Sequence, residues 1–108
     1  MKFKPRKSFE RDLARLAKLD ISIINDVKDA VNLLLENGHL PAEYQEHALE
    51  RRWTGYIECH LRDTPSGSTP SATNDVLMIY RWDLDTLVLI GVRVGSHHQL
   101  FNGLNSNK

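Results

Sequence analysis

The sequence holds a single cysteine, Cys59, in 108 residues. One thiol excludes a disulfide framework within the chain and is typical of a reducing compartment. The longest mostly apolar stretch, residues 87–92, is far shorter than the ~18 residues of a membrane span. The N-terminal region is charged and lacks the apolar segment of a signal peptide. We therefore expect a cytoplasmic protein that does not associate with a membrane.

The sequence also lacks net charge, because 14 basic and 14 acidic side chains balance. The total therefore gives no indication of a nucleic-acid or acidic partner. The charges are unevenly distributed, with +4 over residues 1–20, −5 over residues 21–50 and +1 over residues 51–108. There is no internal repeat, and the length predicts a single domain over residues 1–108 with one modest core.

Apolar residues in the first part of the chain follow a helical spacing. Residues 2–5 alternate and contain lysine and proline, which is typical of an edge strand. Ser8 is a candidate N-cap for a first helix, and Asp20 for a second helix that ends at Gly38. The pattern predicts two amphipathic helices joined as a hairpin, followed by a loop over residues 39–51.

The spacing of apolar residues changes to a period of two in residues 52–62, which predicts a strand. In this strand Trp53 and Cys59 share one face, and Tyr56, Glu58 and His60 share the other. Residues 76–82 and 86–94 predict two more strands joined by a tight turn. Residues 63–75 are rich in Thr, Pro, Ser and Gly and predict a long flexible connection. A short helical turn is expected over residues 96–101, before a tail that should fray.

This order predicts an α+β fold in which the helical hairpin packs on one face of a small antiparallel β-sheet. The other face of the sheet is then open. In the last strand, Val88, Ile90 and Val92 are expected beneath the helices because they are apolar and β-branched. Arg93 would then share the open face with His60.

Histidine is more frequent than average, with five in the chain. His60 lies on the open face, His97 and His98 follow the strand of Arg93, and His47 lies in the loop before residues 52–62. A cluster of His, Arg and Asp beside an aromatic ring suits cleavage of an RNA phosphodiester. One imidazole can take the 2′-hydroxyl proton while another protonates the leaving 5′-oxygen. A guanidinium can stabilise the phosphoryl charge, and an aromatic ring can stack on a base.

Other interpretations of these residues are purely structural. A histidine on the open face can simply be solvated, Asp75 can cap a turn, and Phe101 can anchor the terminal turn in the core. A zinc site is not expected, because neighbouring Cys59 and His60 would point to opposite faces of a strand. We therefore predict no metal and no cofactor, and Cys59 on the core side is not expected to be a nucleophile.

Four segments together resemble a known family. They are LPAEYQEHAL at 40–49, WTGYIECH at 53–60, DVLMIY at 75–80 and RVGSH at 93–97, followed by Leu100 and Phe101. In this order they resemble the YafQ-type toxins of the RelE/ParE superfamily. The resemblance implies a RelE-like fold and a type II toxin that acts as a ribosome-dependent mRNA endoribonuclease, or mRNA interferase, in the ribosomal A site. It also implies a cognate antitoxin and binding of operator DNA only through the complex of the two proteins.

The resemblance also assigns roles to individual residues. Four positions match the family's catalytic residues: His47, His60, Asp75 and His97. Phe101 matches an aromatic near the active site, and Arg93 matches a phosphate contact. The Gly-Ser-His pattern selects His97 rather than His98.

Two questions stay open at this stage. Because the connection over residues 63–75 is long, Asp63 competes with Asp75 for the acidic role, and the general acid and base among the histidines are not distinguished. The alternative functions are a ParE-like toxin that binds DNA gyrase without nuclease chemistry and a non-catalytic interaction module. The set of histidines argues against the gyrase toxin, because a pure binder has no need of proton-transfer groups.

Overall fold

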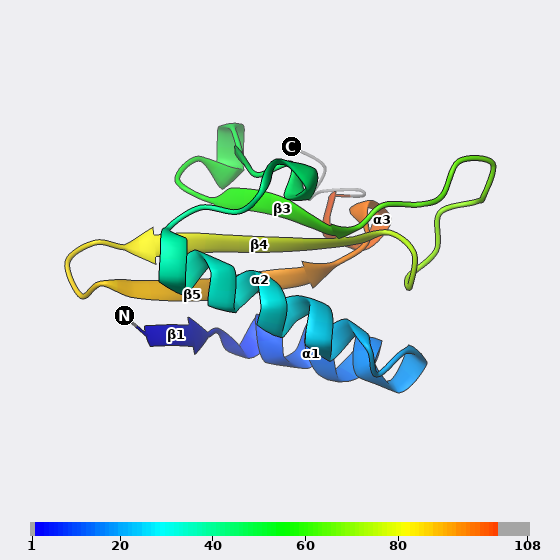
Figure 1. Ribbon diagram of the computed structural model, residues 1–108, viewed down its shortest axis with the longest axis horizontal. Coiled ribbons are helices and arrows are strands. Elements are labelled where there is room, and N and C mark those ends of the chain that lie inside the picture. The colour runs from blue at the N-terminus through cyan, green and yellow to red at the C-terminus, as the bar shows by residue number, and fades with distance from the viewer. Residues whose placement is uncertain (1, 102–108) are drawn as a thin grey trace.

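The computed structural model describes residues 2–101 and has the two layers expected of an α+β fold (Figure 1). The helices α1 (Lys7–Leu19) and α2 (Ile23–Asn37) pack on one face of a five-stranded sheet. The strands lie in the order β1-β5-β4-β3-β2. Their bounds are Lys2–Pro5 for β1, His47–Ala48 for β2, Ile57–Arg62 for β3, Val76–Asp83 for β4 and Val88–Gly95 for β5. The short helix α3 (His97–Phe101) follows β5, and the predicted tail lies outside the described residues.

The helical hairpin and the antiparallel arrangement of β3, β4 and β5 confirm the sequence prediction. The sheet as a whole is mixed, however, because β1 pairs with β5 in parallel. The chain passes from β1 almost directly into α1, and α1 then packs along β5. None of the helices in residues 2–101 has the length and apolar character needed to cross a membrane.

The two helices lie where the apolar spacing predicts them, but their predicted caps have other roles. Ser8 lies inside α1, and its hydroxyl donates a 2.6 Å hydrogen bond to the carbonyl of Val92 on β5. Asp20 follows α1 and accepts hydrogen bonds from the backbone N–H and the hydroxyl of Ser22, at 3.0 and 2.6 Å. Gly38 ends α2 in the left-handed conformation, as predicted.

The main core lies between the helices and the sheet. Gly91 on β5 is part of this packing, because a Cβ there would lie 2.7 Å from the ring of Phe3 and 2.9 Å from the ring of Phe9. Those rings pack edge to face with 5.5 Å between their centroids. Glycine at this position therefore allows β1 and α1 to close over the sheet.

A β-bulge in β5 changes which side chains face the helices. Ile79 pairs with Arg93, whereas the next residue, Tyr80, pairs with Gly91, so Val92 is an extra residue in β5. An extra residue in one strand reverses the alternation of side chains beyond it.

The expectation that Val88, Ile90 and Val92 lie beneath the helices is therefore wrong. Ile90 and Val92 pack in a second cluster on the opposite face of the sheet, which we call the open face. Leu89 before the bulge and Val94 after it belong to the core beneath the helices. The β-branched pattern was not decisive because both faces of β5 are covered by apolar side chains.

The strand predicted over residues 52–62 is shorter at its N-terminal end. Residues Arg51–Trp53 form a 3₁₀ turn, and Gly55 has a φ of +94°. Trp53 consequently packs in the open-face cluster. The alternation of residues had predicted it on the core side, which is wrong. Cys59 is fully buried in the core as expected, and burial raises the pKa of its thiol.

Candidate active site

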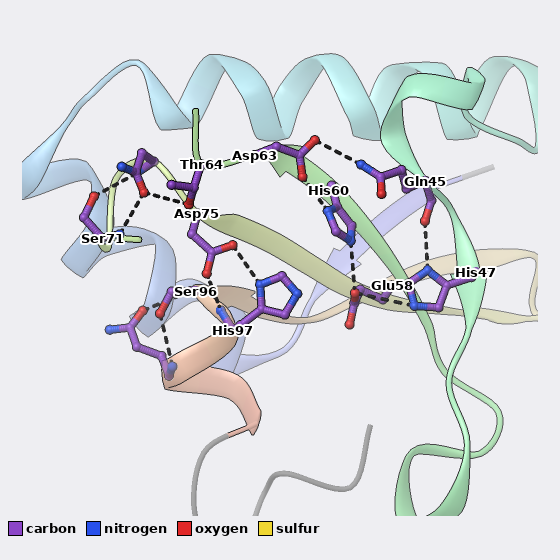
Figure 2. A network of polar contacts seen from close by, with 12 residues as sticks. Gln45, His47, Glu58, His60, Asp63, Thr64, Ser71, Asp75, Ser96 and His97 are labelled. Carbon is purple, nitrogen blue, oxygen red and sulfur yellow. Dashed lines mark hydrogen bonds and ion pairs between the residues drawn. The ribbon is translucent and has the colours of Figure 1, made fainter. Parts of the chain in front are cut away.

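Three histidines form a row on the open face of the sheet (Figure 2). The ring of His60 on β3 lies between the other two, with 6.3 Å between its centroid and that of His47 and 5.6 Å to that of His97. His47 comes from β2, and His97 is the first residue of α3. The structure thus brings together three residues that are 13 to 50 positions apart in the chain.

The pairing of strands explains why these histidines meet. His47 on β2 is in register with Glu58 on β3. His60 is in register with Leu77 on β4, and Leu77 is in register with Gly95 on β5. Because β5 ends at Gly95, α3 starts at the same height of the sheet as His60. The segment 39–51, predicted as a loop, contains the short strand β2, and the pairing of β2 with β3 places His47 in the row.

Glu46 anchors the segment that carries His47. Its Oε2 accepts a 2.5 Å hydrogen bond from the hydroxyl of Tyr80, and its Oε1 accepts one from the backbone N–H of Leu40 at 3.1 Å. Burial, together with the hydrogen bond to Glu46, raises the pKa of Tyr80, so this hydroxyl stays a donor. The anchor fixes the chain one residue before His47.

Asp75 orients His97 through two contacts. One carboxylate oxygen lies 2.8 Å from the ring Nδ1, and the other accepts the backbone N–H of His97 at 2.9 Å. Ser96 and Gln99 cap α3 reciprocally, side chain to backbone, at 3.1 and 3.3 Å. Because a carboxylate accepts hydrogen bonds, the neutral ring carries its proton on Nδ1 and keeps a lone pair on Nε2.

Asp63 performs the same task for His60. Its Oδ1 lies 2.7 Å from Nδ1 of His60, and its Oδ2 accepts a hydrogen bond from the side chain of Gln45 at 3.0 Å. The His60 side chain is only 12% exposed. Asp63 and Asp75 therefore do not compete for one position, because each acid holds a different histidine.

His47 is oriented by the backbone. Its Nδ1 lies 2.8 Å from the carbonyl oxygen of Gln45, which can only accept, so this nitrogen carries a proton. The side chain is 44% exposed. In all three histidines the Nδ1 atom is thus held by a fixed acceptor, so proton transfer to or from these rings would use Nε2.

Glu58 is a site residue that the sequence analysis missed. It is fully buried, and its Oε1 lies 3.5 Å from Nε2 of His47 and 3.4 Å from Nε2 of His60. The alternation in β3 had placed Glu58 on the same face as His60 but assigned it no role. Its position two residues before His60 was the signal available in the sequence.

The site also offers ligand atoms for a metal ion. Glu58, His60 and His97 each contribute one such atom, and these atoms lie within 4.8 Å of one another. Two imidazoles and a carboxylate form a donor set of the kind that binds zinc. This set differs from the zinc ligands considered from the sequence, since Cys59 points into the core.

Arg93 is held by α1 and not by the histidines. Its Nε and Nη2 lie 2.6 and 3.2 Å from the two carboxylate oxygens of Asp12, which is 3% exposed. Asp12 also accepts the backbone N–H of Val94 at 3.1 Å. Arg93 does share a cross-strand row with Ile79 and Glu58, but its guanidinium clamps α1 to the edge of β5.

Phe101 is 6% exposed and packs edge to face against Trp53, with 6.1 Å between the ring centroids. This arrangement matches a core anchor for α3.

His98, next to His97, is exposed.

Arg62 ties the helical hairpin to the long connection between β3 and β4. A β-bulge between His60 and Arg62 turns its side chain toward the helices, contrary to the predicted alternation. Its guanidinium donates to Asp26 at 2.6 Å, to Asp20 at 2.9 Å and to the carbonyl of Thr73 at 3.0 Å. Hydrogen bonds from Ser22 and Arg62 lower the pKa of Asp20 to about 2. Arg62 therefore braces the chain beside both Asp63 and Asp75.

The predicted flexible connection also has internal hydrogen bonds. The side chain of Asn74 accepts from the backbone of Ser71 at 2.7 Å and from the hydroxyl of Thr64 at 3.1 Å. It also donates to the carbonyl of Thr69 at 3.1 Å. These bonds fix the approach of the chain to Asp75.

The sequence of this chain is similar to a known protein family and to individual members of that family. The family model described as bacterial toxin of type II toxin-antitoxin system, YafQ, matches residues 1–102. A Haemophilus influenzae protein that carries the YafQ toxin name is 35% identical over 78 residues, which are 70% of this chain and 66% of that protein. The mRNA interferase toxin YafQ of Escherichia coli is 31% identical over 94 residues, covering 86% of this chain and 87% of that protein.

Solved structures show the same fold. The toxin in the E. coli DinJ-YafQ toxin-antitoxin complex superposes with a TM-score of 0.69 at 27% identity, covering 93% of this chain and 96% of that one. A metal-bound toxin from Helicobacter pylori superposes with a TM-score of 0.76 at 27% identity, covering 94% and 99%.

Proposed function

This chain belongs to the YafQ family of bacterial type II toxin–antitoxin toxins, and we propose that it is a ribosome-dependent endoribonuclease that cuts mRNA in the ribosomal A site. The observation that carries the proposal is the row of three histidines, each with its Nδ1 held by a fixed acceptor. The E. coli relative is named an mRNA interferase, which supports the substrate class.

The chemistry needs two proton transfers, and the row supplies the groups for both. The 2′-oxygen attacks the phosphorus, and the bond from phosphorus to the 5′-oxygen breaks. One imidazole Nε2 takes the 2′-hydroxyl proton, and a second imidazolium gives its proton to the leaving 5′-oxygen. His97 with Asp75 and His60 with Asp63 are the two best oriented pairs, at 2.8 and 2.7 Å. His47 is the third candidate for these roles.

Arg93 and Phe101 have secondary roles in this proposal. Two guanidinium nitrogens of Arg93 are bound to Asp12, so a phosphate contact would use the remaining Nη1. Phe101 is buried against Trp53, so its ring would support the base-binding surface from below. Asp75 and Asp63 act as positioning residues for the two histidines.

The partners follow from the family. We propose that a cognate antitoxin neutralises the chain, as in the DinJ-YafQ toxin-antitoxin complex of E. coli. Operator DNA would be bound only through that complex, and ribosome and mRNA would be the targets of the free toxin.

No metal takes part in the proposed reaction, but a metal ion would interfere with it. A related H. pylori toxin has been solved with bound metal. In this chain an ion bound by Glu58, His60 and His97 would occupy the nitrogen lone pairs that proton transfer requires. Metal binding and catalysis are therefore expected to exclude each other.

Mapping of RNA 5′-ends in a cell-free translation reaction tests the proposal. Wild-type protein should cut mRNA only when ribosomes are present. His97→Ala should stay folded, bind antitoxin and lose roughly 10²-fold or more in rate, the usual effect of removing an acid or base. Intact mRNA combined with inhibited DNA supercoiling would instead support a gyrase toxin, and neither effect would support an interaction module.

A further inference from the structure

Two arginines face one tyrosine on the open face of the sheet. The guanidinium carbons of Arg6 and Arg81 lie 5.7 and 5.8 Å from the ring centroid of Tyr56. Arg6 also approaches the Tyr56 hydroxyl at 3.4 Å, and this contact lowers the pKa of Tyr56. The three side chains come from separate parts of the sheet: Arg6 follows β1, Tyr56 precedes β3 and Arg81 lies on β4.

The two guanidiniums form no close ion pair, although the charge of Arg81 is one of the smaller causes that lower the pKa of Asp83. Among residues 2–101, no carboxylate forms an ion pair with Arg6 or Arg81, whereas Arg15, Arg62 and Arg93 are each paired. Arg6 is exposed, and Arg81 and Tyr56 are half-buried. In a chain without net charge, this cluster is therefore a local concentration of positive charge.

The cluster is continuous with the histidine row. Tyr56 directly precedes β3 and packs in the open-face cluster, and Glu58 and His60 follow it on the same face. Tyr56 therefore lies about 13 Å from His60 at ~3.3 Å per residue. Trp53 packs against Tyr56 on one side and Phe101 on the other, with centroid distances of 5.4 and 6.1 Å. Aromatic rings thus connect the cluster to α3, which carries His97.

We propose that Arg6, Tyr56 and Arg81 form a subsite for the RNA strand next to the cut, which rests on the proposed endoribonuclease function. Guanidinium groups match the oxygens of a phosphodiester, and a half-buried aromatic ring such as that of Tyr56 can offer its open part for stacking on an unpaired base. The alternative is that these three side chains only pack against one another. In that case, replacing them would not change the affinity for RNA.

Binding of RNA to a cleavage-inactive protein tests the subsite. The double variant Arg6→Gln/Arg81→Gln is compared with Arg11→Gln/Lys18→Gln, a matched control that removes two exposed charges from α1. Both are made in the His97→Ala chain, and the probe is a short labelled single-stranded RNA of mixed sequence. The subsite variant should bind RNA on the order of 10-fold more weakly. The slope of log affinity against log salt concentration should become shallower by about 1.4, or about 0.7 for each phosphate contact.

Tyr56 gives a second test within the same assay. Tyr56→Phe keeps the ring and should retain affinity, whereas Tyr56→Ala should lose it because the stacking surface is gone. Arg6→Lys/Arg81→Lys keeps the charges and should fall between wild type and the glutamine variant. Equal affinity in the subsite and control variants, or no RNA binding by any protein, would overturn the subsite.

Cleavage on ribosomes separates the two proposals. With His97 restored, the subsite variant should need more toxin for half-maximal cleavage at an unchanged maximal rate. If wild-type protein cuts no mRNA, the endoribonuclease proposal fails and the RNA-binding assay alone judges the subsite. If the variant loses antitoxin in co-purification but keeps RNA affinity, the cluster is a protein contact and the inference is wrong.

Discussion

Asp75 binds His97 through both carboxylate oxygens, one to the ring Nδ1 at 2.8 Å and the other to the backbone N–H at 2.9 Å. The first contact sets which ring nitrogen carries the proton. The second fixes the start of α3 against β4. One side chain, 22 residues away in sequence, thus determines both the position and the tautomer of His97.

Asp75→Asn should separate these two effects. An amide oxygen can still accept the backbone N–H, but an amide NH₂ facing Nδ1 would move the ring proton to Nε2. We expect single-turnover cleavage of ribosome-bound mRNA to fall by roughly 10²-fold or more, with little loss of stability. His98→Gln, at the exposed neighbouring position, is the control and should cut normally. Near-wild-type cleavage by Asp75→Asn would show that the tautomer of His97 is unimportant.

Arg93→Ala should affect stability first. It leaves the buried Asp12 without its bidentate partner, so the free energy of unfolding in urea should fall by about 1–3 kcal/mol. Arg93→Lys keeps the charge but not the two-nitrogen contact, and its loss should be smaller.

Asp12→Ala distinguishes this clamp from a phosphate contact, because it breaks the same ion pair and leaves the guanidinium in place. If Arg93 contacts the scissile phosphate, folded Asp12→Ala protein should cut mRNA faster than folded Arg93→Ala protein. Equal rates would limit Arg93 to holding α1 on β5.

Asp20→Asn should remove a pH-dependent part of the stability. The pKa of Asp20 is lowered from 3.8 to about 2, so the carboxylate stabilises the folded state at pH values above its unfolded pKa. This stabilisation is lost as the pH falls through about 2. Urea unfolding should therefore show a difference between wild type and variant at pH 7 that shrinks below pH 4. Asp29→Asn, which removes one carboxylate from an exposed position of α2, is the matched control for the change in charge.

Zinc should inhibit cleavage, and a chelator should leave the activity of the metal-free protein unchanged. The ion would bind Glu58, His60 and His97, which offer ligand atoms within 4.8 Å of one another. In calorimetric titration, His97→Ala should bind zinc at least about 10-fold more weakly, since changes even in the outer shell of a site have that effect. His98→Gln should bind zinc like wild type. Cleavage that requires zinc would contradict the proposed acid–base mechanism.

Local patterns in the sequence were enough to predict the helices and three main strands, whereas the grouping of His47, His60 and His97 was predicted from the family resemblance. Helical spacing is insensitive to what packs on the helix, and β3, β4 and β5 follow one another with antiparallel connections. The resemblance to the YafQ family, carried by short segments in the right order, is confirmed by the family match over residues 1–102.

Only the tertiary structure shows where side chains stop alternating between the two faces of a strand. A bulge at Val92 and another between His60 and Arg62 shift the side chains that follow to the other face, and a bulge leaves no mark in apolar spacing. The parallel pairing of β1 depends likewise on how α1 docks against β5.

The sequence by itself determined which residues could perform acid–base chemistry, because imidazoles and carboxylates are recognisable by type. It did not determine which acid serves which histidine, since Asp63 and Asp75 are equally available until the β3–β4 connection is braced by Arg62 and Asn74. Pairs such as Arg93 and Asp12, 81 residues apart, are selected by packing of α1 on β5 and not by any local preference.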